Sequence, residues 1–221
     1  MAQLASALAW GASGWQFKSA HPDKRFMNDA RKRKITSVVS QRQSGFIVVL
    51  EDIHDPHNAG AILRTCDALG IQNVYFIFEK EETYNPAKIG KSSSSSANKW
   101  LNFKTFTSTK ACLRELKDDG YTTIATALTN RSESLMTATF PEKKIAVLVG
   151  NEHRGLSEGA LTFADRIILI PMMGFVQSLN VSVATAITLW EITKQRSGMK
   201  LLSKQSQQQL LKDFIQRSGG K

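Results

Sequence analysis

The sequence predicts an α/β fold, in which helices cover both faces of a mostly parallel sheet. Short, continuous apolar runs such as residues 46–50 and 145–149 have the pattern of strands that are buried on both faces. Segments with a helical spacing of apolar residues alternate with these runs along the chain, as in other folds of this class. The chain has 221 residues, 42% of them hydrophobic, so it can form one domain with a substantial core and extended ends.

The expected elements begin with the strand at residues 46–50. A turn at residues 55–58 follows, and we expect Asn58 to cap a helix that ends at Gly70. The apolar positions of this helix are Ile62, Leu63 and Cys66. After it, the pattern predicts a strand at 74–78, a helix at 110–119 closed by Gly120, strands at 122–127, 145–149 and 167–170, and a helix at 157–164.

Three further helices are expected outside this alternation. One covers much of residues 23–39 and carries four consecutive basic residues at 31–34. Residues 181–190 leave almost no polar face, which indicates a helix that is buried in a core or against a second subunit. Residues 201–217 form a basic, glutamine-rich helix whose apolar side holds Leu210, Leu211, Phe214 and Ile215.

The charge is concentrated at the two ends. Lys and Arg total 29 against 19 acidic residues, a net charge of +10. Residues 18–42 hold eight basic and two acidic residues, and residues 194–221 hold seven and one. The body from 43 to 193 holds fourteen basic and sixteen acidic residues. This distribution indicates a partner that is a polyanion, and an enzyme acting on small molecules would not need it.

Composition excludes several classes of protein. Cys66 and Cys112 lie far apart, which excludes a disulfide framework and a cysteine zinc site, and His54 and His57 lack a third ligand at useful spacing, so we expect no metal. No apolar run approaches the roughly 20 residues of a membrane span. Residues 1–17 carry no charge and so lack the basic start of a targeting segment. We therefore expect a poorly ordered N-terminus at 1–22 and a cytoplasmic protein with free thiols.

Common catalytic motifs are absent from the sequence. The first strand is not followed by GxGxxG, and no GxSxG is present. Residues 150–157 have the glycine spacing of a phosphate-binding P-loop, but Leu156 stands where its lysine belongs. The serine run at 92–96 fits either a flexible loop or a segment that touches phosphates or gates a site, and both interpretations stay open.

Three polar clusters follow three of the expected strands. They are His57 and Asn58 with Arg64, then Gly150, Asn151 and Glu152, and then Ser178, Leu179 and Asn180. Ligands of open parallel sheets bind outside the carboxyl ends of the strands, so the clusters are expected to form one site.

Taken in this order, the clusters resemble the motifs of the SPOUT superfamily of RNA methyltransferases, in its SpoU/TrmH branch of 2′-O-ribose methyltransferases. The matching stretches are residues 50–58 with 61–70, 149–157 and 170–184, and the resemblance runs from about residue 24 to 195. Together with the basic helices at both ends, the stretch at 95–100 is most similar to members that methylate a D-loop guanosine of tRNA. The serine run departs from the loop that is usual in that subgroup.

The resemblance implies a C-terminal trefoil knot, S-adenosylmethionine (SAM) bound within it, and a homodimer whose sites take residues from both subunits. It implies that Arg64 is catalytic, with a supporting set made of Asn58, Glu152, Ser178 and Asn180 that shapes the site and holds Arg64. Because a guanidinium group is essentially never deprotonated, we expect Arg64 to clamp a phosphate and orient the 2′-hydroxyl rather than act as a base. The cofactor residues that it implies are Thr126, Ala127, Leu128, Gly150, Asn151, Ile170, Met172 and Leu179.

The basic ends are then expected to bind tRNA or another structured RNA. The candidate contacts are Lys24, Arg25, Arg31, Arg33 and Arg196, and the helix at 201–217 is expected to dock on the body or on RNA. The expected organisation is a methyltransferase domain at 23–195 and a basic helical extension at 196–221. Two alternatives stay open, namely an rRNA 2′-O-ribose methyltransferase and a non-catalytic RNA-binding module of the same fold.

Overall fold

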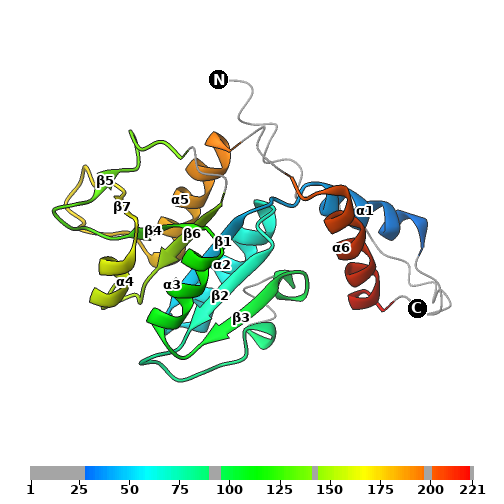
Figure 1. Cartoon of the computed structure of the whole chain (residues 1–221), viewed down its shortest axis with the longest axis horizontal. Helices are drawn as coiled ribbons and strands as arrows, with labels where there is room; N and C mark the ends of the chain where they lie inside the picture. Colours follow the sequence, from blue (N-terminus) through cyan, green and yellow to red (C-terminus); the bar gives the residue numbers. More distant parts are fainter. Residues whose placement is uncertain (1–27, 90–95, 141–143, 197–200, 220–221) are drawn as a thin grey trace.

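The computed structural model describes residues 28–89, 96–140, 144–196 and 201–219. Its centre is a seven-stranded sheet with the order β3-β2-β1-β6-β4-β7-β5 (Figure 1). Every pairing between neighbouring strands in the described part of the chain is parallel. The strands are β1 (Phe46–Glu51), β2 (Asn73–Ile77), β3 (Asn102–Phe106), β4 (Thr122–Thr126), β5 (Glu133–Ser134), β6 (Ile145–Val149) and β7 (Arg166–Leu169).

The central strands β1 and β6 are buried at every position, as their unbroken apolar sequence predicts. They lie side by side with Phe46 opposite Ile145 and Val49 opposite Leu148. Side chains that alternate along β1 enter two different cores, with Val48 in one and Val49 in the other. The sheet is therefore covered on both faces.

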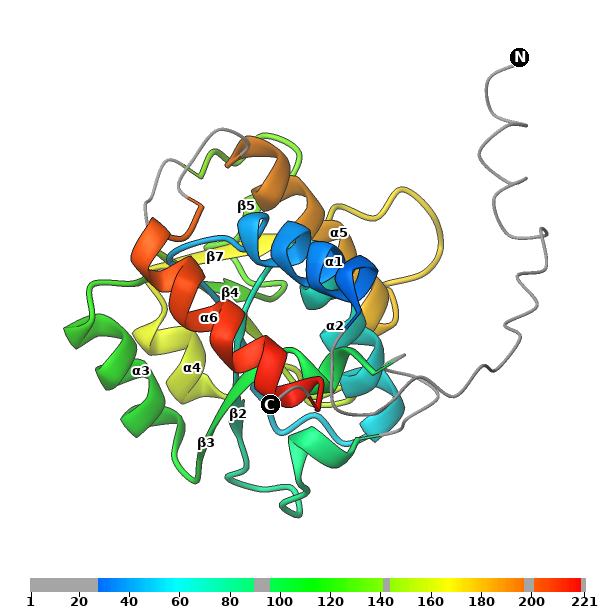
Figure 2. The same cartoon turned by 90° about the vertical axis from the view of Figure 1, so that its right-hand side faces the viewer.

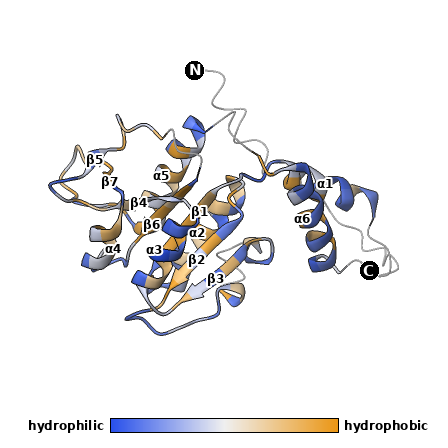
Figure 3. Cartoon of the chain, viewed as in Figure 1, coloured by the Kyte–Doolittle hydropathy of each residue, from blue (hydrophilic) through white to orange (hydrophobic). Residues whose placement is uncertain are grey.

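Helices pack on both faces of the sheet, which confirms the predicted fold class. On one face lie α2 (Pro56–Ala68) and α5 (Val181–Gln195), which contribute Ile62, Leu63, Leu189 and Ile192 to the larger core. On the other face lie α3 (Thr109–Asp118) and α4 (Glu158–Phe163). Figure 3 shows the apolar residues concentrated in the sheet and in the helix sides that face it. In the described ranges, no helix is long and apolar enough to cross a membrane.

The helices α1 (Asp29–Ser40) and α6 (Lys204–Arg217) form a pair beside the sheet (Figures 1 and 2). Their shared core consists of Ile35, Val39, Leu210 and Phe214. The expected docking of the C-terminal helix on the protein body thus takes the form of packing on α1. The described basic residues of α1 and α6 consequently lie on neighbouring helices.

Two buried or half-buried arginines tie this helix pair to the sheet domain. Arg42 is buried, forms an ion pair with Asp67 of α2, and lies 5.6 Å from the centre of the Phe214 ring. Arg217 donates hydrogen bonds to the backbone oxygen of Leu101 at 2.8 Å and to the side-chain oxygen of Asn102 at 2.8 Å. These contacts fix the C-terminal end of α6 against the sheet domain.

The observed elements differ from the expected ones in several places. Strands β3 and β5 and the short 3-10 helices η2 (Pro86–Lys88) and η3 (Ala97–Lys99) were not expected. Asn58 is not the cap of α2, because Asp55 accepts a hydrogen bond from the His57 amide and Pro56 occupies the first turn. The first described helix begins at Asp29 and is capped by Asn28. The N-terminus at 1–22 and most of the serine run at 92–96 lie outside the described residues.

The sheet is built outward in both directions from β1. The next two strands of the chain, β2 and β3, lie on one side of β1, and all later strands lie on the other side, beginning with β6. The carboxyl ends of β1 and β6 therefore form the switch point at which ligands of doubly wound sheets bind. The loops after β4 and β7 reach the same edge of the sheet, because β4 neighbours β6 and β7 neighbours β4.

Candidate active site

The side chain of Glu152 joins the loop after β6 to the loop after β1. One of its oxygens accepts a hydrogen bond from the backbone N–H of His54 at 2.9 Å. The other accepts from the backbone N–H of Asp55 at 3.2 Å and from the Asn58 side chain at 2.9 Å. Three donors thus converge on this half-buried carboxylate.

These donors also determine the protonation state of Glu152. Burial raises its pKa, but the hydrogen bonds from Asn58 and from the His54 and Asp55 amides outweigh that effect, so the pKa lies below the ordinary value. The carboxylate is ionised at neutral pH and already accepts three hydrogen bonds. It is therefore suited to holding the two loops together and poorly suited to accepting a proton.

Asn58 extends the same network to the third polar cluster. Its side-chain oxygen accepts a hydrogen bond from the Asn180 amide group at 3.1 Å. The Asn180 oxygen in turn accepts from the backbone of Ser182 at 2.9 Å, which caps α5. One chain of hydrogen bonds therefore brings together Glu152, Asn58 and Asn180, which come from three separate motifs.

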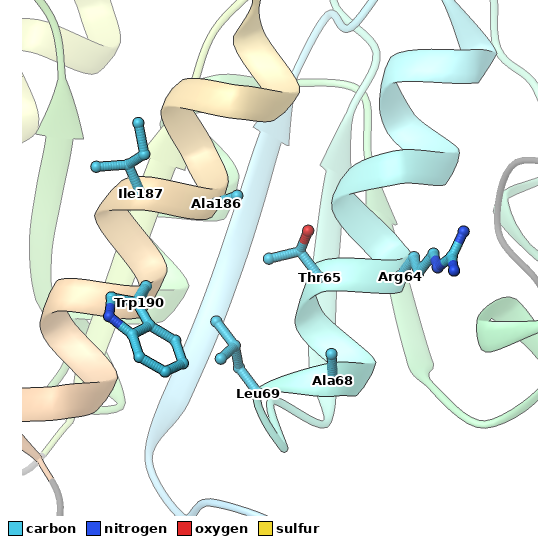
Figure 4. A pocket seen from close by; sticks show the side chains of 7 residues that line it. All are labelled: Arg64, Thr65, Ala68, Leu69, Ala186, Ile187 and Trp190. Atoms are coloured by element: carbon cyan, nitrogen blue, oxygen red, sulfur yellow. The ribbon is translucent and has the colours of Figure 1, made fainter. Parts of the chain in front are cut away.

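Arg64 and Ser178 do not belong to this network. Arg64 lies on the exposed side of α2, and its side chain points away from α5 (Figure 4). Ser178 is exposed, and neither side chain forms a hydrogen bond or ion pair with any described residue. The expectation that the supporting set holds Arg64 is thus wrong for a single copy of the chain, because α2 turns Arg64 toward solvent.

A shallow cleft of about 590 Å³ lies between the C-terminal half of α2 and the middle of α5 (Figure 4). The residues that line it are Arg64, Thr65, Ala68, Leu69, Ala186, Ile187 and Trp190. Its wall on α5 is apolar, and the Trp190 side chain is 62% exposed. The helix that was expected to be apolar on all sides is consequently buried on one side only.

The residues expected to hold the cofactor lie at the carboxyl ends of β4, β6 and β7. Thr126 donates from its hydroxyl to the Leu148 backbone oxygen at 2.9 Å, which ties the ends of β4 and β6 together. A Cβ atom on Gly150 would lie 2.3 Å from the backbone of Gly155, so the turn after β6 requires glycine. These contacts fix the shape of the strand ends.

The same strand ends offer groups that suit an adenosine. No backbone hydrogen bond within the described segments uses the N–H groups of Ile170, Met172 or Leu179. The neighbouring Leu128 side chain is 80% exposed. Free donors beside uncovered apolar surface fit a ligand with a flat ring and polar edges.

Asn151 has a different role from the expected one. Its side chain is buried and donates to the Asp52 backbone oxygen at 2.7 Å while accepting from the His153 and Arg154 amides. Its backbone N–H and C=O are also paired, with the backbone of Gly155 at 3.0 and 2.9 Å, so Asn151 shapes the turn after β6.

The expected RNA contacts fall into three groups. Arg31 and Arg33 are exposed on α1, whereas Lys24 and Arg25 lie outside the described residues. Arg196 is a correction, because its side chain is only 3% exposed, donates to the Ser44 backbone oxygen at 2.9 Å and lies over the Phe46 ring. A buried guanidinium that is committed to the core cannot serve as an RNA contact.

The structure also adds residues that the sequence did not single out. Asp52 has a left-handed backbone (φ 51°), and its carboxylate accepts from the amides of Glu79, Lys80 and Glu81. No spacing signal marks these residues, since they are adjacent only after β1 and β2 pair. Over the part of the chain that the structure covers, no group of three or more His, Cys, Asp or Glu residues could hold a metal ion.

Fold and site together define a class: a parallel α/β protein that binds its ligand where polar loops meet at the switch point of the sheet. Comparison with known proteins makes the assignment specific. Residues 45–190 match the SpoU rRNA Methylase family, and the chain belongs to that family.

Individual relatives cover most of the chain. It is 38% identical over 200 residues to the tRNA (guanosine(18)-2'-O)-methyltransferase of Thermus thermophilus, which covers 87% of this chain and 100% of the relative. The crystal structure of the A. aeolicus TrmH/SpoU tRNA modifying enzyme is similar with a TM-score of 0.76 and 32% identity, over 86% of this chain and 96% of that one. The AdoMet-bound rRNA methyltransferase from Sinorhizobium meliloti matches with a TM-score of 0.61 and 25% identity, over 76% and 61% of the two chains.

Proposed function

We propose that the protein transfers the methyl group of SAM to the ribose 2′-hydroxyl of a guanosine in the D-loop of tRNA. The observation that carries this proposal is the full-length similarity to a relative named for that reaction, combined with the network of Asn58, Glu152 and Asn180 at the strand ends. An rRNA substrate is the alternative that the Sinorhizobium relative represents.

When bound, SAM supplies an electrophilic methyl group. The backbone of Gly150, Ile170, Met172 and Leu179 would hold its adenosine, with Thr126, Ala127 and Leu128 lining the same pocket. The ends of β4 and β6 are held by Thr126 and by the turn at Gly150, so this part of the pocket has its shape before a ligand arrives. Such preorganisation lowers the free-energy cost of orienting the reactants.

Neither Glu152 nor Arg64 is proposed to act as a general base. Glu152 has a lowered pKa and already accepts three hydrogen bonds. Arg64 is a permanent cation that can clamp the target phosphate and stabilise the 2′-oxygen as its proton leaves to solvent. Arg64 is therefore proposed as the catalytic residue, with Asn58, Glu152 and Asn180 as the residues that shape its surroundings.

A second copy of the chain would complete this site. The exposed side of α5 presents Val183, Ile187 and Trp190, an apolar row that is unusual on a monomer surface. Arg64 lies beside this row and points away from its own α5 (Figure 4). A homodimer through α5 would bury the row and bring Arg64 toward the strand ends of the partner.

The helix pair α1–α6 is proposed to bind tRNA. Arg31, Lys32, Arg33 and Lys34 are all exposed on α1, and α6 brings the second basic segment beside them. The packing of α1 on α6 supports one RNA-binding unit attached to the methyltransferase domain. We also infer a trefoil knot from membership of the SpoU family, as the resemblance implies. A cytoplasmic location is inferred from the proposed tRNA substrate.

The proposal is tested with labelled SAM and an unmodified tRNA transcript. We expect label to enter the transcript, and a matched transcript with 2′-deoxyguanosine at the target position to remain unlabelled. Equal labelling of both transcripts would mean that the methyl group goes elsewhere. No labelling of either would support the non-catalytic alternative.

A further inference from the structure

The side chain of Glu81, in the loop after β2, contacts both loops that Glu152 joins. One oxygen lies 2.7 Å from Nδ1 of His54, in the loop after β1. The other accepts from Nη2 of Arg154 at 2.5 Å and from Nδ2 of Asn151 at 3.4 Å, in the loop after β6. The Glu81 side chain is only 16% exposed, whereas those of His54 and Arg154 are about half exposed or more.

Glu81 and Glu152 therefore hold the same two loops from two sides. Glu152 binds the backbone of His54 while Glu81 binds its side chain. Along the other loop, Glu152 lies between Asn151 and Arg154, which both donate to Glu81. These contacts form a closed ring that runs from Glu81 through His54 to Glu152 and returns along the backbone through Arg154. A movement of Glu81 would therefore change the orientation of Glu152.

The backbone fixes Glu81 within this ring. Its own amide donates to the Asp52 carboxylate at 3.1 Å, and the next aromatic residue, Tyr84, donates to the Ile53 backbone oxygen at 3.2 Å. Three successive residues of the loop after β1, at 52–54, are thus each bonded to the segment at 81–84. The loop after β2 is consequently a third support of the site, although no site residue lies on it.

We propose that Glu81 is a positioning residue for methyl transfer, acting through His54 and Arg154 to hold Glu152 and Asn58 in place. This inference rests on the proposed function. Ion pairs with exposed partners contribute little to folding, so the ring serves mainly to fix local geometry. A misplacement of the site by a fraction of an ångström is enough to slow a reaction that depends on orientation.

The ring contains a histidine, His54, whose protonation changes its bond to Glu81. The pKa of His54 is raised, mainly by its hydrogen bond to Glu81 and by the negative charge of Glu81. Glu152 raises this pKa further, whereas slight burial and the positive charge of Arg154 lower it. Protonated His54 strengthens its bond to Glu81, and this contribution is lost as the pH rises through the raised pKa. Arg154 donates to the other oxygen of Glu81, so this contact does not depend on the charge of His54.

The test compares Glu81→Gln with Glu82→Gln, a matched loss of charge on the exposed neighbouring side chain. Single-turnover methyl transfer is measured at saturating SAM and tRNA between about pH 6 and about pH 8. We expect Glu81→Gln to lower the rate roughly tenfold at the acid end, with tRNA affinity within about twofold and Tm within about 4 °C of the wild type. Glu82→Gln is expected to keep the wild-type rate.

The pH dependence separates positioning from a general structural effect. The ratio of the wild-type rate to the Glu81→Gln rate is expected to shrink as the pH rises, because the wild type itself loses the charge on His54. In a His54→Gln background, the same ratio is expected to be independent of pH. Equal rates for Glu81→Gln and Glu82→Gln, or a ratio in the wild-type background that does not change with pH, would overturn the inference. Absence of transfer by the wild-type chain would instead refute the proposed function, and this inference with it.

Discussion

Replacing Glu152 with Gln tests the central network of the site. The substitution keeps the size of the side chain but turns one of its two acceptor oxygens into an NH2 donor. Since three N–H donors converge on this carboxylate, at least one of them would then face another N–H group. A hydrogen bond to a charged acceptor contributes about 1.5–3 kcal/mol. With allowance for the solvent that reaches this half-buried side chain, we expect Glu152→Gln to lower the free energy of unfolding by about 2–3 kcal/mol.

The sign of the pH dependence follows from the lowered pKa of Glu152. Because the folded pKa lies below the unfolded value of about 4.3, the stabilisation is fully present above that value and is lost as the pH falls through the folded pKa. Wild type and Glu152→Gln are therefore expected to differ at neutral pH and to converge in acid.

The assay is denaturant unfolding at neutral pH and near pH 4 and below, with Glu82→Gln as the control. At neutral pH, thermal unfolding is added to the denaturant series, and we expect a fall in Tm of roughly 4–12 °C for Glu152→Gln and almost none for the control. The methyl-transfer rate is expected to fall between about 10-fold and about 100-fold. Equal stability of Glu152→Gln and wild type at neutral pH, or a difference that persists unchanged in acid, would refute this account of the carboxylate.

Four further variants test other parts of the proposal. Arg64→Ala is expected to abolish methyl transfer while tRNA affinity changes by no more than about 1–3 kcal/mol; full activity would remove Arg64 from the mechanism. Gly150→Ala places a Cβ 2.3 Å from the Gly155 backbone, so calorimetry should detect a large loss of SAM affinity, and a wild-type Kd would contradict the fit. Trp190→Glu puts a charge in the apolar row of α5, so light scattering should show a monomer, whereas an unchanged mass would place any interface elsewhere. The exposed basic cluster on α1 consists of Arg31, Lys32 and Arg33. Neutralising it should weaken tRNA binding and its salt dependence without changing SAM affinity, and an unchanged salt dependence would exclude the cluster from the tRNA interface.

The sequence predicted the central elements well because burial on both faces leaves a strong pattern. Strands β1 and β6 are continuous apolar runs, and their boundaries agree with the structure to within one residue. Strand β3 was missed because it lies at the edge of the sheet and is only half buried, and β5 has just two residues. Strand order could not be predicted, since periodicity carries no information on which strands pair.

The site was predicted in part. The rule that ligand groups gather at strand ends correctly brought Glu152, Asn58 and Asn180 together. It could not show that Asp55 is the cap of α2, although Pro56 after it was a usable signal. Arg196 was predicted to contact RNA because it lies in a basic segment, but tertiary packing buries its side chain in the core. Glu81 carries no motif at all, because its partners come from loops far away in the sequence.

The most direct test of the account is to map where the protein methylates RNA. The wild-type chain would be incubated with labelled SAM and a mixture of total tRNA and rRNA, both from cells that lack the enzyme, and the labelled nucleotide identified after digestion. The account predicts a single 2′-O-methylguanosine in the D-loop of tRNA, absent from the Arg64→Ala reaction. Label confined to rRNA, or found on a base rather than on a ribose, would contradict it.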